Sequence, residues 1–434
     1  MPGTNGLEHA VKMVDRLLSA GALEAQAHHS DVAVHEVNFS HERISLVRSI
    51  HNSQTQLAAY MGGKRGTSTA NTRDEAEASI AVERACESAR SSESDPGHAT
   101  AQAESCPTIP KGDAQPNKDA MLELARNFSL DLQREFPAIR CDNCALSFSH
   151  GIVSLANSQG VRQQDNRGTH SVSMMFTAKE GPLTSSFYTH HQGSFSLPGR
   201  LLDLPHLRSR LSDAVAALRP YALNGTFTGD LIFTSESLPT LLGALNGALT
   251  GQSLLSGTTP YKDREGQPIA SAHFTFVNAP GDPRFPYTCG FDGQGVPART
   301  TIIVDRGILT NYFIDHYASR RLGRPQTAGL GNWIVRPGDT PMEDIVRGTK
   351  RGIILGRFSG GAPNSNLDFS GIAKNSLYVE NGEILGPLGE TMIAGNFQEI
   401  LRNIRAVSSE VHNNGSHCLP AVASTGITIT AGKA

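Results

Sequence analysis

Residues Phe358–Asn396 read FSGGAPNSNLDFSGIAKNSLYVENGEILGPLGETMIAGN, and this stretch gives the clearest structural signal in the second half of the chain. Its short apolar runs, such as Ser376–Glu380 (SLYVE) and Thr391–Ala394 (TMIA), alternate with glycines. Short apolar runs bounded by turn residues predict β-strands. Asn381-Gly382 is typical of a two-residue hairpin turn, because a type I′ turn needs a positive φ at both positions. We therefore predict several short strands joined by tight turns.

The composition of the chain limits the kinds of protein and partner that can be expected. A chain of 434 residues is long enough for two or three domains. The formal net charge of -3 gives no basic surface for nucleic acid, so no nucleic-acid partner is expected. No apolar run approaches the roughly 20 residues that span a bilayer, so no membrane partner is expected either. The N-terminus does not read as a secretory signal, and six cysteines without framework spacing predict reduced thiols in a cytoplasmic protein.

The first half of the sequence predicts helices packed on an antiparallel sheet. Apolar residues recur at helical spacing in four segments, and runs with strand alternation lie between them. These helical segments are residues 7–18, 72–90, 119–136 and 204–218. The linker 91–117, rich in Ser, Pro, Gly, Ala and Gln, is predicted to be a flexible loop.

The pattern changes at Tyr221–Gly229, where LNGTFTG interrupts the helical spacing. We therefore place a domain boundary near residue 222. Residues 1–221 are predicted to form an α+β domain, and residues 222–434 a β-rich domain, barrel-like or sandwich, with a few helices. The fold class is α+β.

Two cysteine motifs were considered as chemical sites. Cys141 and Cys144 form a CxxC motif, but no second CxxC stands at zinc spacing, and on an alternating strand the two side chains would face opposite ways. We interpret this motif as structural. His417 and Cys418 are weak metal candidates, because two adjacent residues need further ligands from elsewhere in the chain.

Several segments of the second half resemble the TldD/PmbA family of metallopeptidases. Residues 290–323 (GFDGQGVPARTTIIVDRGILTNYFIDHYASRRLG) resemble the family's turn with the pattern FD.EG and the strand and helix after it. DFSGIAKNSLYVENGEI (368–384) and TMIAGNFQEILRNI (391–404) resemble its closing segments. The resemblance is strong from Gly229 onward and weaker before it.

The resembled family contains two kinds of chain, which pair with each other, and the resemblance implies that this chain is one of them. TldD-type chains carry HExxxH on a helix, in which the histidines bind a metal ion and the glutamate acts as a base. In this chain the corresponding segment is SLPTLLGALNGALTGQSLL (237–255), which contains no His, Glu or Asp. The motif positions fall near Leu242, Gly243 and Gly247, whose side chains cannot ligate a divalent ion. The chain therefore resembles the PmbA-type (TldE-type) member that lacks the motif.

The resemblance implies a non-catalytic subunit that pairs with a TldD-type zinc metalloprotease chain to process peptides or modified peptide precursors. No catalytic residue and no cofactor are then expected in this chain, and the zinc is expected in the TldD-type partner. The cleft for the peptide is expected near two glycine-rich regions, since glycine lets another backbone approach closely. The candidate residues are Asp292, Gly293, Gly295, Asp368, Ser370, Gly371, Glu380 and Asn381.

Two other functions stay open from the sequence. One is a stand-alone enzyme whose chemistry would use His273, His316 or Cys418. The other is a homodimeric protein that binds a peptide or natural product without cutting it.

Overall fold

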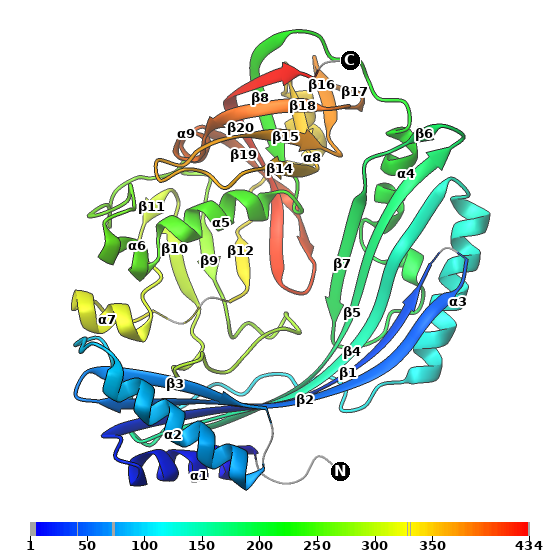
Figure 1. The fold of residues 1–434 in the computed structure, drawn as a ribbon. Coiled ribbons are helices and arrows are strands. Elements are labelled where there is room, and N and C mark those ends of the chain that lie inside the picture. The colour runs from blue at the N-terminus through cyan, green and yellow to red at the C-terminus, as the bar shows by residue number, and fades with distance from the viewer. Residues whose placement is uncertain (1–5, 41, 72–73, 328, 330, 433–434) are drawn as a thin grey trace.

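The computed structural model describes residues 6–40, 42–71, 74–327, 329 and 331–432, and it contains two sheets (Figure 1). The first sheet has seven strands in the order β3-β2-β1-β4-β5-β6, with β7 also paired to β5, and every pairing is antiparallel. Its strands are β1 (Glu24–Phe39), β2 (Ile44–Met61), β3 (Lys64–Ala70), β4 (Ile139–Asn157), β5 (Arg162–Glu180), β6 (Leu183–Thr184) and β7 (Tyr188–Ser194).

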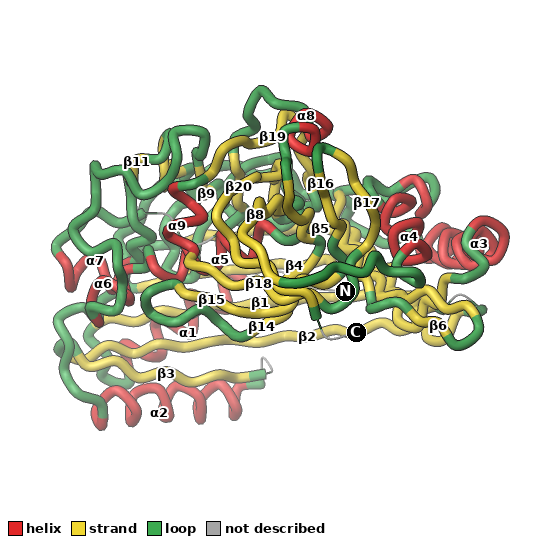
Figure 2. Tube along the Cα trace, turned by 90° about the horizontal axis from the view of Figure 1, so that it is seen from above, coloured by secondary structure: helices red, strands yellow, loops and turns green. Residues whose placement is uncertain are grey.

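Helices cover the two ends of this curved sheet and leave the middle of its outer face bare (Figure 1). The helices are α1 (Gly6–Ser19) and α2 (Glu75–Ser91) at one end, and α3 (Lys118–Glu135), the 3₁₀ turn η1 (Leu201–Asp203) and α4 (Leu207–Ala216) at the other. Each end has its own apolar core. Figure 2 shows the long strands that run between the two ends.

The close packing of α2 on β3 follows from small residues. The buried face of α2 is largely alanine, including Ala81, Ala85 and Ala89. A Cβ on Gly66 of β3 would lie 2.1 Å from the Ala89 nitrogen, so only glycine fits there. Asp74 begins the helix by accepting hydrogen bonds from the N–H groups of the first turn.

The second sheet has thirteen strands and includes two parallel pairs, β12 with β20 and β8 with β13. Its central path runs β11-β10-β9-β12-β20-β8-β13-β16-β17. The strands are β8 (Thr226–Phe233), β9 (Phe276–Asn278), β10 (Thr301–Asp305), β11 (Ile308–Leu309), β12 (Trp333–Val335), β13 (Arg351–Leu355), β14 (Arg357–Gly360), β15 (Asp368–Lys374), β16 (Leu377–Glu380), β17 (Glu383–Pro387), β18 (Thr391–Asn396), β19 (Ile404–Asn413) and β20 (His417–Ala431). In the part of the chain that the structure describes, neither sheet closes into a barrel. The predicted α+β class is confirmed, and the barrel-like form considered for the second half is not found.

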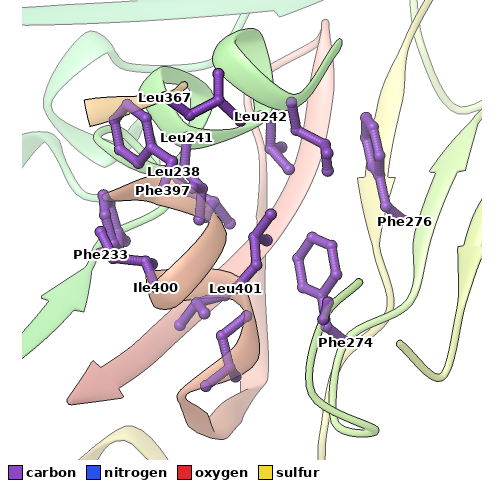
Figure 3. Packing of buried hydrophobic residues seen from close by; sticks show 14 of the residues in the cluster. Phe233, Leu238, Leu241, Leu242, Phe274, Phe276, Leu367, Phe397, Ile400 and Leu401 are labelled. Carbon is purple, nitrogen blue, oxygen red and sulfur yellow. The ribbon is translucent and has the colours of Figure 1, made fainter. Parts of the chain in front are cut away.

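The largest apolar core lies in this second half (Figure 3). Its helices are α5 (Leu238–Ala248), α6 (Gly251–Ser256), α7 (His316–Leu322), α8 (Met342–Arg347) and α9 (Phe397–Arg402). Leu238, Leu241 and Leu242 of α5 pack near Phe397 and Leu401 of α9 (Figure 3). Burial of these side chains stabilises each by roughly 1.5–3 kcal/mol relative to exposure.

The hairpin predicted from Asn381-Gly382 is confirmed. Glu380 of β16 pairs with Glu383 of β17, and the two turn residues have φ angles of 51° and 83°. Positive φ at both positions is the type I′ requirement that Asn and Gly meet at low cost.

The expected orientation of the CxxC cysteines is wrong. A β-bulge between Cys141 and Asn143 shifts the register of β4 against β5. Cys141 and Cys144 therefore point to the same face, are 1% exposed in the core beneath α3, and are joined by a disulfide. The pairing differs from the expectation of reduced thiols. The bulged residue changes the two-residue period of the strand and so brings the two sulfur atoms to the same face.

The linker 91–117 contains almost no regular structure but is fastened to the first sheet at several points. Thr100 donates to Glu24 Oε2 through its N–H (2.8 Å) and its hydroxyl (2.6 Å). Asn157 Nδ2 donates to the Ala101 carbonyl at 2.8 Å, and the Gly168 N–H donates to the Lys111 carbonyl at 2.6 Å. We call residues 99–113 the strap.

No helix among the described residues has the length and apolar character needed to cross a bilayer.

Candidate functional site

The turn Asp292–Gly295 lies where the second half of the chain meets the first sheet. Asp292 Oδ1 accepts hydrogen bonds from the N–H groups of Gln294 (2.9 Å) and Val296 (3.0 Å). The Gly295 N–H donates to the Asp292 carbonyl at 2.9 Å, and Gly295 has a φ of 82°. Burial raises the pKa of Asp292, and the two backbone donors oppose that rise. The Asp292 carboxyl group therefore serves to build the turn.

This turn contacts the first sheet directly. Gln26 Nε2, on β1, donates to the Gly293 carbonyl at 3.0 Å. A Cβ on Gly295 would lie 2.8 Å from Val161 Cγ1 and 3.0 Å from Leu155 Cδ2. The close approach of the two halves at this point requires glycine at position 295.

Two cavities are lined partly by the loop that contains this turn. The larger has a volume of about 540 Å³ and the smaller about 310 Å³. Both volumes fall in the range of small-ligand sites, which is roughly 300–1,000 Å³. The larger is lined by the strap, by β4 and β5 and by Gly290 and Phe291; the smaller by Tyr60, Arg65, Gly97, His98, Ala99, Gln294, Asp315, His316 and Tyr317.

The larger cavity has a mainly polar wall. Glu104 of the strap forms an ion pair with Arg299 of the second half. Asp165 forms an ion pair with Arg167 at 3.3 Å, and Gln163 Oε1 is buried without a hydrogen-bond partner. Such donors and acceptors suit the polar groups of an extended peptide.

The thiol beside this cavity is not an activated nucleophile. Cys106 lies in the strap, and burial raises the pKa of its thiol to about 11, with Cys289 adding to the rise. The thiolate is the nucleophilic form, so Cys106 is protonated and poorly reactive at neutral pH.

Beside the smaller cavity, α7 contacts the segment that precedes the strap. The Tyr317 hydroxyl donates to Asp95 at 2.8 Å, and Arg321 pairs with the same carboxylate at 2.5 Å. His316 Nδ1 lies 3.2 Å from Gln326 Oε1, and His316 Nε2 is buried without a partner. The His316 side chain therefore forms part of the wall of this cavity.

The acidic candidate of the glycine-rich tract, Asp368, organises a loop. Its carboxylate accepts from Asn396 Nδ2 (2.8 Å) and Asn364 Nδ2 (3.0 Å), and these bonds hold the pKa of Asp368 below its usual range. Gly371 pairs with Gly360 across two strands, and a Cβ at either would lie within 2.7 Å of the Phe358 ring. The glycines here make room for Phe358.

The remaining candidates lie at another hairpin. Glu380 Oε1 accepts from the Tyr378 hydroxyl at 3.1 Å and lies 3.8 Å from Arg351 Nε. The exposed Asn381 forms the turn, and its N–H donates to the Lys350 carbonyl at 2.7 Å. β16 pairs with β13 and β17, whereas β15, which carries Asp368, Ser370 and Gly371, pairs with β14 and β18. The eight predicted residues are thus distributed over three places rather than gathered in one site.

Helix α5, where the sequence analysis expected the counterpart of the HExxxH motif, has one apolar face and one open face. Leu242 is fully buried in the core (Figure 3). A Cβ on Gly243 or Gly247 would meet no atom within 4 Å, so both positions face open space. Leucine and glycine side chains do not fit a divalent ion, so the segment cannot hold a metal as the motif of the resembled chains would.

The weak metal candidates His417 and Cys418 are enclosed by other side chains. His417 stacks on Trp333, with ring centroids 4.9 Å apart, and burial lowers its pKa. Cys418 is buried, and burial raises the pKa of its thiol. Within the described residues, no group of three His, Cys, Asp or Glu side chains could hold a metal ion. His273 lies in an exposed loop position.

Sequence reasoning did not find the strap residues, Arg299 or Gln163 as parts of a site. The strap was predicted as a loop because of its composition, and nothing in that composition shows where it crosses a sheet. Gln163 alternates with exposed residues on β5, which indicates a buried face but not a cavity.

The two-sheet α+β fold and the sequence of the second half together indicate a family of known proteins. The sequence model described as the PmbA/TldA metallopeptidase C-terminal domain matches residues 226–431. The second half of the chain is therefore a PmbA/TldD-family domain.

Relatives support this assignment over most of the chain. The "Metalloprotease PmbA homolog" of Haemophilus influenzae is 24% identical, with 94% of this chain and 93% of the relative covered. The "Zinc metalloprotease TldD homolog" of Saccharolobus solfataricus is 30% identical over 30% of this chain and 32% of that protein. The crystal structure of TldE from Thermococcus kodakarensis matches with a TM-score of 0.85 at 18% identity, covering 97% of this chain and all of that one. This last likeness shows a shared fold.

Proposed function

We propose that this chain is a non-catalytic, TldE-type subunit that pairs with a TldD-type zinc metalloprotease chain to process peptides. The observation that carries the proposal is the sequence of α5. Near the positions where the resembled TldD-type chains have His, Glu and His, this chain has Leu242, Gly243 and Gly247, and the whole segment 237–255 contains no His, Glu or Asp. No side chain at these positions can ligate zinc or take a proton from water.

The subunit's role in this proposal is to complete the peptide cleft of its partner. Two features support this role. The polar wall of the larger cavity can bind the polar groups of an extended peptide, and the open glycine face of α5 lets a peptide backbone approach closely. In this proposal the eight predicted cleft residues contribute through their backbone groups and loop conformations and not through their side chains. The Asp292–Gly295 turn is favoured among them, because it adjoins both cavities.

Co-purification tests the proposal. The chain would be expressed with a TldD-type chain of the same organism, and the assembly and each chain alone would be measured for mass, zinc content and peptide cleavage. We expect a mixed assembly with zinc in proportion to the TldD-type chain. Stoichiometric zinc and cleavage in the isolated chain would favour a stand-alone enzyme. Peptide binding by a homodimer, with no gain from the added chain, would favour a binding protein.

A further inference from the structure

The smaller cavity beside the Asp292–Gly295 turn has walls from both halves of the chain. The first half contributes Tyr60 of β2 and Arg65 of β3, and the second half contributes Asp315 and the first residues of α7, which lies above β3 in Figure 1. The two walls touch, since a Cβ on Gly97 would lie 2.6 Å from the Tyr317 ring. The volume of about 310 Å³ is at the lower end of the range for whole small ligands.

Arg65 supplies a positive charge to this cavity. It is an exposed residue, so a ligand can reach it. Burial raises the pKa of Tyr60 and the charge of Arg65 opposes that rise, so the guanidinium lies near the Tyr60 hydroxyl. Among the described residues, no carboxylate forms an ion pair with Arg65. Glu24 also acts on Tyr60, but it does not line the cavity, and its Oε2 accepts two hydrogen bonds from Thr100. The guanidinium is therefore available to a carboxylate.

Asp315 supplies a negative charge to the same cavity. It too is exposed, and its Oδ1 accepts a hydrogen bond from the Ala318 N–H at 2.7 Å at the start of α7. Burial raises the pKa of Asp292 and the charge of Asp315 adds to that rise, so the Asp315 carboxylate lies on the side of the Asp292–Gly295 turn. No Lys, Arg or His in the described ranges forms an ion pair with Asp315. This carboxylate is therefore available to a cation.

The two charges favour a ligand that carries both signs. Asp95, beside the cavity, is already neutralised, since it accepts from the Tyr317 hydroxyl at 2.8 Å and pairs with Arg321. The uncompensated charges of the lining are then Arg65 and Asp315, which form no ion pair with each other and so are held apart. A purely anionic ligand would be repelled by Asp315, and a purely cationic one by Arg65. A zwitterion meets an opposite charge at each end.

We propose that the smaller cavity binds a zwitterion, either a free α-amino acid or a short peptide. The carboxylate of the ligand pairs with Arg65, and its ammonium group pairs with Asp315. An amino acid and a short peptide carry the same two terminal groups at different separations, so ligands of graded length distinguish these two sources. The site lies wholly within this chain and its test needs no TldD-type partner, so its outcome is separate from that of the proposed function.

The test uses four molecules of similar size on the isolated full-length chain. Dialanine carries both charges, N-propionylalanine lacks the ammonium group, alanine ethylamide lacks the carboxylate, and N-ethylpropionamide lacks both. Saturation-transfer NMR and calorimetric titration at pH 7 measure binding. We expect a zwitterion to bind about tenfold more tightly than either singly charged molecule, because each charged hydrogen bond is worth at least that factor. Comparison of alanine, dialanine and trialanine identifies the preferred length.

Two variants assign each end of the ligand to one residue. Asp315→Asn removes the charge and keeps a good helix cap, and Arg65→Gln removes the positive charge and keeps a polar side chain. Each should weaken binding of the zwitterion about tenfold. Asp315→Asn should not weaken binding of N-propionylalanine, and Arg65→Gln should not weaken binding of alanine ethylamide. Asp119→Asn and Arg126→Gln, at exposed residues of α3, are the matched controls and should bind like the wild type.

Three results would overturn the proposal. The first is that none of the zwitterions binds. The second is that the singly charged or uncharged molecules bind as tightly as the zwitterions. The third is that the two cavity variants have no more effect than the α3 controls, or weaken all four molecules alike, which is the result of a general loss of structure.

Discussion

For single residues, the structure predicts that alanine substitutions at two glycines of one turn have different effects on stability. Gly295 has a φ of 82°, and a Cβ there would lie 2.8 Å from Val161; a Cβ on Gly293 would meet nothing within 4 Å. Gly295→Ala should destabilise the chain by about 1–3 kcal/mol through backbone strain and overpacking. Gly293→Ala should stay within about 0.5 kcal/mol of the wild type. Urea unfolding midpoints check both, and equal midpoints would contradict the described packing of the turn.

Residue roles could be predicted from the sequence only where they are local. Asn381-Gly382 needs nothing beyond its own backbone conformation to form a turn, so its position was predictable. Asp368 was considered a cleft carboxylate because its partners could not be known. Asn396 reaches it only after β15 pairs with β18, and that pairing joins residues distant in sequence; Asn364, four residues before Asp368, reaches it through the fold of the intervening loop.

At the scale of elements, the open face of α5 predicts a gain in stability. Glycine in an exposed helix interior costs about 0.5–1 kcal/mol relative to alanine. The double variant Gly243→Ala with Gly247→Ala should therefore raise the free energy of unfolding of the isolated chain by about 1–2 kcal/mol. Chemical denaturation measures the change. A loss of stability would show that another part of the chain contacts this face.

The hydrogen bonds that hold the strap lead to a prediction about amide hydrogen exchange. Glu24 holds Thr100 through two hydrogen bonds, of 2.8 and 2.6 Å. Glu24→Ala should release this end of the strap and speed amide hydrogen exchange over residues 99–105, with little change in α3. Glu83→Ala, on the exposed face of α2, is the control. Unchanged exchange in the strap would contradict the account of how it is fastened.

Elements with strong local patterns could be predicted, whereas their assembly could not. The segment 119–136 became α3 (Lys118–Glu135) because its apolar spacing and Asn117 cap are local signals. β20 pairs with β8, β12, β18 and β19, and no local pattern specifies these partners. The bulge at Cys141 likewise depends on the register with β5.

At the scale of the whole molecule, the β19–β20 hairpin joins the two halves through a group of histidines. The Gly193 N–H of β7 donates to the Asn414 carbonyl at 2.8 Å. His412 of β19 lies against His206, with ring centroids 4.5 Å apart, and 3.5 Å from Glu236. Burial, with a contribution from Arg210, lowers the pKa of His412 to about 4 and that of His190 to about 3.

This group predicts that stability falls on acidification. The unfolded chain protonates these histidines near pH 6.5, and the folded chain only near pH 4 or below. Stability is therefore fully present above about pH 6.5 and declines below it, by up to about 1.4 kcal/mol per pH unit for each histidine. Unfolding free energies between pH 7.5 and 5 measure the slope. His412→Gln should reduce that slope and His51→Gln, at an exposed site, should not; an unchanged slope in His412→Gln would contradict the assignment.

We propose above that this chain completes a metalloprotease whose zinc lies in another subunit. The most direct test is to titrate this chain into a fixed amount of a TldD-type chain and to follow peptide cleavage. We predict that cleavage rises and saturates at a fixed ratio of the two chains, while this chain alone cleaves nothing. Cleavage in proportion to this chain alone, unaffected by the TldD-type chain, would contradict the claim.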